Sequence, residues 1–546
     1  MPSEVVRRKI SNELSNDHEP SESPSENYRR AYFRRHFRRT IFDISQHEEE
    51  KLEKLKEEVK KMFAATPNDA HHKLDLVDTI QRLGVGYHFE KEIDDYLKYT
   101  YNINGSKKGN DNDLHIVALR FRLLRQQGYY VHCNVFNEFM DNESKFKESL
   151  VSNVQGMLSL YEAAHMAIHG EEILDEALKF SSSHLKSMMH STMNNYLASQ
   201  ISEAVQIPIR KSVTRIAAKK FMSIYKEKRD SHDEMLLNFA KLDFNLLQRK
   251  HQKELCDINC IMFNLPPWWK ALDFENKLPF ARDKVVECYF WIMSVYFEPK
   301  YEIARKFLTK VLNMTSILDD IYDVEGTLDD LPLFTEAIQR WDGRAIDQLP
   351  PYMRVCYQAL LDVYAEMEEE MEKVGRSYGV HYAKEEMKKL ACLYYEEAKW
   401  WFNKSKPTAE EYLNVAILSS GYPMLSAAAL VGMVGDVITK EDFEWITNTP
   451  QIIEAKVSAV DCHMNEHGSS KEEAIAEFEL QVLNAWKDIN QGSLITPTSP
   501  SMPILMRVVN LARFMHLLYR DYNGYTNSKI KTKEFISFVL IEPVTI

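Results

Sequence analysis

Residues 309–326 read TKVLNMTSILDDIYDVEG, a stretch that places three aspartates directly behind a strongly apolar run. Positions four apart lie on one face of a helix, so Asp319 and Asp323 are predicted to point the same way, with Asp320 beside them. Two carboxylates that face an apolar interior repel each other, and removing them from water is costly. The pattern therefore predicts that something cationic lies between them.

A divalent-cation site explains this stretch better than a solvated acidic helix face. A DDxxD pattern alone is weak evidence, because acidic faces are usually solvated, but here the flanking residues are apolar. Carboxylate oxygens suit Mg²⁺, which takes one or two carboxylates together with substrate phosphates. The expected substrate is therefore a phosphate or diphosphate ester.

The composition of the chain indicates an all-α protein with two large helical lobes. The chain has 546 residues, of which 45% are hydrophobic, and only 17 are Gly and 19 are Pro. No run of alternating β-branched residues is bounded by Asn-Gly or Asp-Gly turns. The net charge of −13 argues against a general binder of nucleic acids or anionic membranes. The seven cysteines form no CxxC pair, so neither a disulfide framework nor a zinc site is expected.

Two segments could be mistaken for a targeting signal or a membrane span. The first 27 residues are polar and acidic, which predicts a disordered leader and not a transit or signal peptide. Residues 412–435 are uncharged for long enough to cross a membrane, but SSGYP interrupts them. We therefore expect two buried helices that meet at this break, no membrane span, and a cytoplasmic protein.

Other residues supply the chemistry that a diphosphate site needs. The segment PFARDKVVECYFW contains Arg282 and Lys284, which could bind a leaving diphosphate, and Trp291, whose ring could stabilise a carbocation. Tyr519 and Tyr525 add aromatic rings near the C-terminus. Most such aromatic residues simply pack in a core. A pocket with cations at its mouth and aromatic rings at its base is nevertheless what ionising an allylic diphosphate requires.

The chain resembles a plant terpene synthase of the angiosperm sesquiterpene type. The resemblance covers nearly all of the chain after about residue 45, and it lies in LDFNLLQRKHQKEL, LPFARDKVVECYFW, MTSILDDIYDVEGT, SSGYPML and FVLIEPVTI. It implies an N-terminal α-barrel-like helical lobe at residues 28–231 and a C-terminal class I terpenoid-synthase bundle at residues 232–546. The implied activity is the ionisation and cyclisation of farnesyl diphosphate by a monomer that uses Mg²⁺ or Mn²⁺ and releases diphosphate.

Taken with the residues above, the resemblance implies roles for particular side chains. The metal would be bound by Asp319, Asp320 and Asp323, and the diphosphate by Arg282 and Lys284 together with Asp319 and Asp323. The break after residue 418 would aim backbone carbonyls into the carbocation cavity. The residues expected to line that cavity are Trp291, Ser419, Ser420, Gly421, Tyr422, Tyr519 and Tyr525.

The chain departs from the family pattern at the second metal motif, (N/D)Dxx(S/T)xxxE. NTPQIIEA runs directly into KVSAVDCHMNEHGSSKEEA, so a helix of about twenty residues, or about 30 Å, is predicted to be deleted. Asn465, Ser469 and Glu473 have a matching spacing and are weak candidates for the second metal site. Because Glu466 replaces the expected Asp, HGSSKEEA is better interpreted as a turn and a helix N-cap.

Two alternative functions remain open from the sequence. The predicted deletion favours a catalytically impaired or inactive protein that still has the terpene-synthase fold. The segment NYRRAYFRRHFRR carries six arginines among aromatic residues, as RNA-binding arms do, although the rest of the chain is acidic. RNA binding that depends steeply on salt concentration would support this second alternative.

Overall fold

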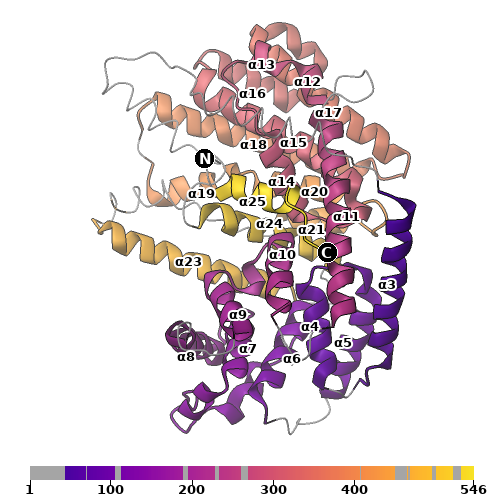
Figure 1. The fold of residues 1–546 in the computed structure, drawn as a ribbon. Coiled ribbons are helices and arrows are strands. Elements are labelled where there is room, and N and C mark those ends of the chain that lie inside the picture. The colour runs from indigo at the N-terminus through magenta and orange to yellow at the C-terminus, as the bar shows by residue number, and fades with distance from the viewer. Residues whose placement is uncertain are drawn as a thin grey trace, which may run out of the picture. The chain divides into compact units, whose positions relative to one another are not determined.

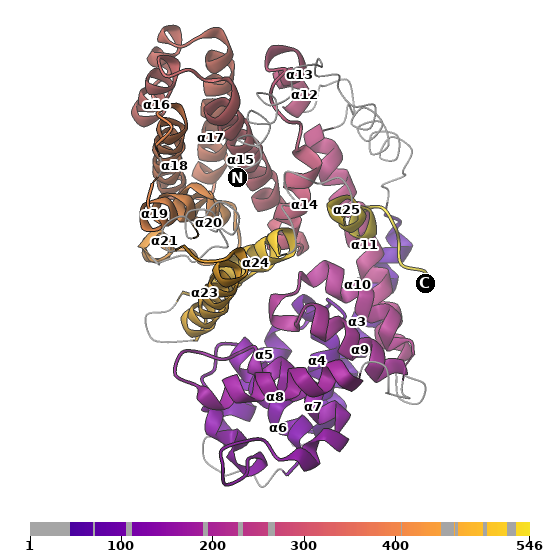
Figure 2. The ribbon, with the colours of Figure 1, turned by 90° about the vertical axis from the view of Figure 1, so that its left-hand side faces the viewer.

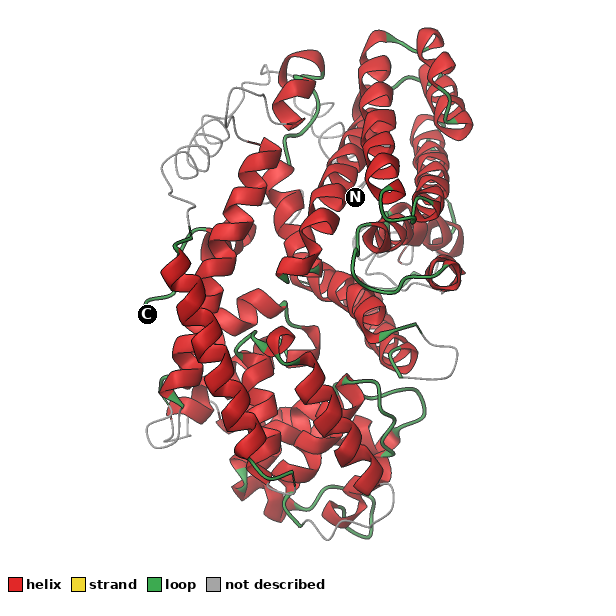
Figure 3. Ribbon diagram, turned by 90° about the vertical axis from the view of Figure 1, so that its right-hand side faces the viewer, coloured by secondary structure: helices red, strands yellow, loops and turns green. Residues whose placement is uncertain are grey.

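The computed structural model describes residues 44–68, 71–104, 112–188, 195–227, 233–259, 268–405, 407–448, 464, 468–494, 500–520 and 531–546. The predicted leader, the arginine-rich segment and the predicted deletion lie outside these ranges. Within them, every regular element is a helix apart from an isolated bridge between Met140 and Phe146 (Figure 3). The all-α prediction is therefore confirmed.

The described chain forms two compact units. One, which we call the aspartate unit, comprises Lys250–Val482 and Leu518–Ile536. The other, the N-terminal unit, comprises Asp43–Arg249 and takes in two later segments, Leu483–Leu517 and Ser537–Ile546. Each unit therefore contains segments that are far apart in the sequence.

The N-terminal unit is built of the helices α3 to α10 and part of α11 (Figure 1). Their apolar side chains form two buried clusters. Its first helix begins at a capping box, in which the Ser45 hydroxyl accepts from the backbone N–H of Glu48 and the Glu48 carboxylate accepts from that of Ser45. Its elements are α3 (Gln46–Ala65), α4 (His71–Arg82), η1 (Gly86–His88), α5 (Glu90–Asn104), α6 (Leu114–Gln126), η2 (Cys133–Phe139), η3 (Glu148–Ser152), α7 (Val154–Ala164), α8 (Glu172–Met188), α9 (Asn195–Gln206), η4 (Ile209–Lys211), α10 (Thr214–Tyr225) and the first part of α11 (Glu234–Asn259).

The aspartate unit contains three long helices, α15, α17 and α18, in which α17 packs against both α15 and α18 (Figure 2). After the end of α11, its elements are α12 (Trp268–Leu272), α13 (Phe274–Lys277), α14 (Val285–Val295), η5 (Pro299–Tyr301), α15 (Glu302–Asp320), η6 (Ile321–Glu325), α16 (Asp330–Arg340), η7 (Gly343–Gln348), α17 (Pro351–Glu372), α18 (Tyr378–Phe402), α19 (Ala409–Ser419), α20 (Tyr422–Val431), α21 (Lys440–Asn448), the first part of α23 (Lys471–Gly492), the end of α24 (Met502–Tyr519) and most of α25 (Lys531–Leu540).

A buried ion pair anchors α15, the helix that carries the first two aspartates, at its N-terminal end. The guanidinium of Arg305 donates two hydrogen bonds, of 2.6 and 2.7 Å, to the carboxylate of Glu254 in α11. The Tyr289 hydroxyl, from α14, donates to the same carboxylate at 2.8 Å. Because breaking a buried ion pair is costly, this contact fixes α11, α14 and α15 relative to one another.

The close approach of α15 and α20 depends on a glycine. A Cβ atom placed on Gly432, just after α20, would lie 2.5 Å from the Cα atom of Ala304 in α15. Real Cβ atoms do not come this close to backbone atoms, so only glycine allows the end of α20 to pack here.

The predicted break in the uncharged stretch is confirmed. Gly421 has a φ of +79°, in the left-handed region that favours glycine, and it separates α19 from α20. Pro423, in the first turn of α20, suits a helix start. By length and composition, Glu410–Val431 is the one described stretch that could cross a membrane, and 67% of its most apolar window is buried inside the protein.

Candidate metal-binding site

Asp319 and Asp320 end α15 and are almost fully buried, with exposed fractions of 4% and 2%. Asp323 lies in η6, which is a single π-helical turn closed by a 2.8 Å bond from the Gly326 N–H to the Ile321 carbonyl. A π turn holds more residues than an α turn, so Asp323 still returns to the neighbourhood of Asp319. The sequence predicted that Asp319 and Asp323 share one helix face, but it did not predict the π turn.

A cation does lie beside the aspartates, and it is the guanidinium of Arg282. One guanidinium nitrogen is 2.9 Å from Asp319 Oδ2 and 2.6 Å from Asp320 Oδ1. The backbone N–H of Arg282 also donates to Asp320 Oδ2 at 2.8 Å. Burial raises the pKa of Asp320 to about 6, although the positive charge of Arg282 opposes this rise. Arg282 thus bridges the adjacent aspartates 319 and 320.

A fourth acidic residue of the site, Glu397 in α18, was not predicted from the sequence. Burial raises the pKa of its carboxyl group to about 7, and the Asp319 carboxylate adds to this effect. Burial also raises the pKa of Asp323 well above its usual range, and repulsion from Asp319 and Glu397 raises it further. The carboxyl groups of Asp323 and Glu397 therefore lie within electrostatic reach of Asp319, in an environment that disfavours a negative charge on either of the two.

The sequence does contain a weak signal for Glu397. The buried residues Leu390 and Tyr394 lie seven and three positions before it, so Glu397 continues an apolar helical stripe. The neighbouring Glu396 pairs with Lys399 on the exposed side, at 2.5 Å. A Glu-Glu pair of this kind is typical of a solvated helix face.

Two tyrosine hydroxyl groups approach the same carboxylates. Burial raises the pKa of Tyr394 well above its usual range, and Asp319, Glu397 and Asp323 add to the effect. Burial likewise raises the pKa of Tyr519, as does the charge of Asp319. The Tyr519 hydroxyl is buried and has no hydrogen-bond partner among the described residues. The structure thus brings the predicted Tyr519 to the aspartates and adds Tyr394, for which the sequence gave no signal.

The remaining predicted residues lie on neighbouring elements. Trp291 is buried in α14 with an exposed fraction of 1%, and Tyr422 is buried at the start of α20. The Nζ atom of Lys284 lies 3.8 Å from Glu287. Tyr525 lies outside the described residues. The assignment of these residues to a cavity or to diphosphate binding remains a prediction.

The weak candidates for a second metal site do not converge in the described part of the chain. Glu473 is exposed, and its carboxylate accepts from the backbone N–H of Ser470 at 2.9 Å. The Ser470 hydroxyl accepts from the Glu473 N–H at 3.2 Å, which completes a capping box at the start of α23. The predicted N-cap is therefore confirmed. Ser469 directly precedes this cap, and Asn465 lies outside the described residues.

The donor set of the site fits a hard divalent cation. Asp319, Asp323 and Glu397 offer carboxylate oxygens, which Mg²⁺ prefers. In the described ranges, no three His, Cys, Asp or Glu side chains are placed to hold a metal ion unaided. A cation bound here would therefore need further oxygen ligands, and Mg²⁺ usually takes these from water and substrate phosphates.

Comparisons with known protein families match most of the chain. Residues 30–206 match the terpene synthase N-terminal domain. Residues 270–457 match the metal-binding domain of the terpene synthase family. The second match contains Asp319, Asp323 and Glu397, and it ends within the stretch where the sequence predicts a deletion.

Curated relatives are similar over nearly their whole length. A (−)-germacrene D synthase of Vitis vinifera is 54% identical over 523 residues, which cover 92% of this chain and 91% of that protein. An (E)-beta-caryophyllene synthase of Origanum vulgare is 52% identical over 520 residues, covering 92% of each protein.

Solved structures share the fold. Isoprene synthase from grey poplar leaves, in complex with three Mg²⁺ ions and dimethylallyl-S-thiolodiphosphate, is 32% identical with a TM-score of 0.83. The alignment covers 92% of this chain and 98% of that one. A limonene synthase with 2-fluorolinalyl diphosphate is 28% identical with a TM-score of 0.85, and the alignment covers 92% and 95% of the two chains.

Proposed function

We propose that this chain, which belongs to the terpene synthase family, ionises farnesyl diphosphate in the presence of Mg²⁺ and converts it to a sesquiterpene. The substrate is inferred from the relatives, since germacrene D and caryophyllene synthases form sesquiterpenes. The observation that carries the proposal is the gathering of the buried Asp319 with the half-buried Asp323 and Glu397, beside Arg282. Such a cluster is unfavourable unless a cation compensates it.

The reaction begins when the C–O bond to the diphosphate breaks and the bonding electrons leave with the diphosphate. Mg²⁺, when bound, supplies positive charge to this leaving group. Asp319, Asp323 and Glu397 would hold a divalent cation through their carboxylate oxygens. The planar guanidinium of Arg282 would bind the diphosphate oxygens when the cation is present.

The allylic carbocation that remains needs a dry environment with negative electrostatic potential. The buried rings of Trp291 and Tyr422 provide π faces that can stabilise it. Burial also excludes water, which would otherwise trap the cation as an alcohol. Loss of a proton from the cyclised cation completes the reaction and yields a hydrocarbon.

The test is a double variant, Asp319→Ala/Asp323→Ala, compared with the parent chain. Mn²⁺ binding, measured by electron paramagnetic resonance, should be lost, because Glu397 alone cannot hold the cation. Any Mg²⁺-dependent product from farnesyl diphosphate should fall by about 100-fold or more, as measured by gas chromatography. The control is Asp329→Ala/Asp347→Ala, which removes the same charge from two exposed positions. Mn²⁺ binding and product formation by the Asp319/Asp323 variant at the level of the parent would show that the site is wrongly assigned.

A further inference from the structure

The side chain of Ser419 contacts the candidate site through Glu397. Ser419 is the last residue of α19 and has an exposed fraction of 8%. Its hydroxyl donates to Glu397 Oε1 at 2.9 Å, whereas its distance to the carbonyl of Ala416 is a longer 3.4 Å. The hydrogen bond to Glu397 therefore joins α19 to α18 directly beside the aspartates.

This contact limits the directions in which the Glu397 carboxylate can point. A glutamate side chain has three rotatable bonds, and repulsion from Asp319 and Asp323 would turn its carboxylate away from them. A hydrogen bond from a hydroxyl group to an ionised carboxylate is stronger than one between neutral groups. Among the described residues, Ser419 holds Oε1, so Oε2 is the oxygen that can turn toward a cation.

The adjacent serine has a different role, although both belong to the Ser-Ser-Gly break. The Ser420 hydroxyl donates to the Ile417 carbonyl at 2.6 Å and accepts from the Tyr422 N–H at 3.3 Å. It thus completes the turn around Gly421 through backbone groups. Of the two serines, Ser419 is the one whose hydroxyl reaches an acidic side chain.

We propose that Ser419 is a positioning residue for the metal site, and that its hydroxyl holds the Glu397 carboxylate toward the cation shared with Asp319 and Asp323. The proposal rests on the function proposed above. It assigns Ser419 to the metal side of the site, whereas the sequence placed it in the wall of the carbocation cavity. Residues that orient metal ligands typically change metal affinity by about 10- to 100-fold when they are replaced.

The test measures Mn²⁺ affinity of the full chain by electron paramagnetic resonance. Ser419→Ala should weaken binding by about tenfold, and Ser419→Thr, which keeps a hydroxyl group, should restore it to within about twofold. Ser405→Ala is the control, because Ser405 is exposed and its hydroxyl donates to the backbone carbonyl of Trp400, and its Mn²⁺ affinity should equal that of the parent. Thermal unfolding of each variant verifies that it folds.

A double-mutant cycle shows whether Ser419 acts through Glu397. In a Glu397→Gln background, Ser419→Ala should cause no further loss of Mn²⁺ affinity, because the carboxylate that it orients is gone. A further tenfold loss would overturn the proposal. If Ser419→Ala does not fold, Ser419→Cys keeps the size of the side chain and weakens the donor, so it should show the same loss.

Two results separate this inference from the proposed function. If Ser419→Ala binds Mn²⁺ as the parent does while Asp319→Ala/Asp323→Ala does not, the positioning role is wrong and the metal site stands. If the parent chain shows no binding that depends on these aspartates, the proposed function fails and the inference fails with it.

Discussion

Arg282 replaces, in this structure, the cation that the aspartates require. Its guanidinium is bound to both Asp319 and Asp320, so it satisfies the carboxylates before any metal binds. The sequence identified Arg282 as a ligand for the diphosphate, and the two roles are compatible if the guanidinium moves when a divalent cation takes its place. If Mg²⁺ replaces the guanidinium in this way, the free energy of unfolding should depend on both Arg282 and Mg²⁺.

We therefore predict that Arg282→Met lowers the free energy of unfolding by about 3 kcal/mol, because it leaves buried carboxylates without a partner. Added Mg²⁺ should recover part of this loss in the variant and stabilise the parent less. The measurement is urea unfolding with and without Mg²⁺. Arg340→Met is the control, since its pair with Glu336 is exposed and should be worth less than about 1 kcal/mol. Equal responses to Mg²⁺ in parent and variant would contradict the exchange.

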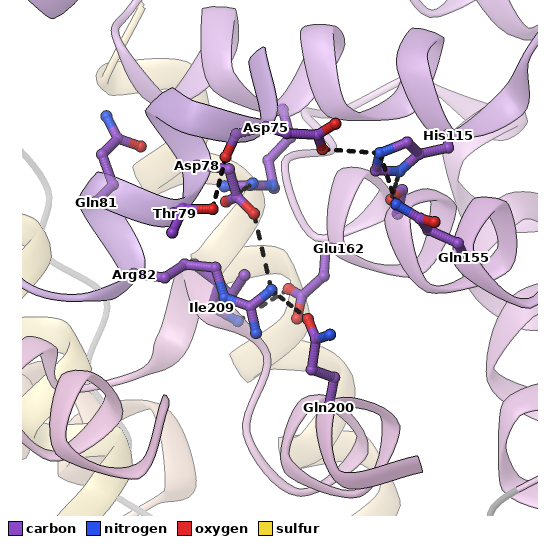
Figure 4. A network of polar contacts seen from close by, with 12 residues as sticks. Asp75, Asp78, Thr79, Gln81, Arg82, His115, Gln155, Glu162, Gln200 and Ile209 are labelled. Atoms are coloured by element: carbon purple, nitrogen blue, oxygen red, sulfur yellow. Dashed lines mark hydrogen bonds and ion pairs between the residues drawn. The ribbon is translucent and has the colours of Figure 1, made fainter. Parts of the chain in front are cut away.

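At the scale of elements, the N-terminal unit contains a buried polar network that ties its helices together. In Figure 4, Asp78, Gln200 and Glu162 lie around Arg82, and they come from α4, α9 and α7. Arg82 donates to the Gln200 side chain at 2.7 Å, and Arg122 of α6 pairs with Asp78. Glu162 accepts a 2.9 Å bond from the backbone N–H of Ile209, where η4 begins.

Glu162 makes this network sensitive to pH. Burial raises its pKa from 4.5 to about 7, although Arg122, the Ile209 N–H and Arg82 oppose the rise, and Asp78 adds to it. Tyr161, Tyr196 and His115 are also in electrostatic contact with Glu162 or its partners. Between about pH 4.5 and 7, the folded state keeps a proton that the unfolded state has released, so the contribution of Glu162 to stability falls across this window.

Replacing Glu162 with Gln should abolish this dependence. The variant should match the parent near pH 4.5 and exceed its free energy of unfolding at pH 8 by an amount on the order of 3 kcal/mol. Urea unfolding at several pH values provides the measurement, with Glu172→Gln, an exposed position in the same unit, as the control. Parallel pH profiles for the parent and Glu162→Gln would refute the interpretation.

On the scale of the whole molecule, the candidate site has one acidic wall in the described residues. Ionising a diphosphate is an electrostatic task shared among several cations, and related isoprene synthase was crystallised with three Mg²⁺ ions. The sequence predicts that the helix carrying the second metal motif is deleted. Without it, Asp319, Asp323 and Glu397 can hold cations on one side of the leaving group only.

We therefore expect very weak turnover of farnesyl diphosphate by this chain, and low stability, because the neighbours of the missing helix lose packing partners. Incubation with farnesyl diphosphate and Mg²⁺, followed by gas chromatography, should give little hydrocarbon or farnesol-derived alcohol. Inserting the corresponding segment of the Vitis vinifera relative should raise product formation substantially. Robust Mg²⁺-dependent turnover by the unaltered chain would contradict this expectation. It would favour Asn465, Ser469 and Glu473 as the second metal site.

The features that the sequence revealed are those that local patterns encode. The aspartate stripe, the break at Gly421 and the cap before α23 each lie within a few residues, where spacing and turn chemistry are informative. Glu397 and the Ser419 hydroxyl acquire their roles from contacts between α15, α18 and α19, and no local pattern records such pairings. The π turn at Asp323 likewise depends on how α15 ends against its neighbours.

The contact between Gly432 and Ala304 restricts how this bundle can be redesigned or can diverge. The two nearest atoms to a Cβ at position 432 are the Cα and N atoms of Ala304, at 2.5 and 2.9 Å, and both belong to the backbone. Shortening the partner side chain, as in Ala304→Gly, would therefore create no room for Gly432→Ala. A substitution at position 304 therefore cannot compensate for a larger residue at position 432. We expect libraries that randomise both positions to recover glycine at 432, whatever residue stands at 304.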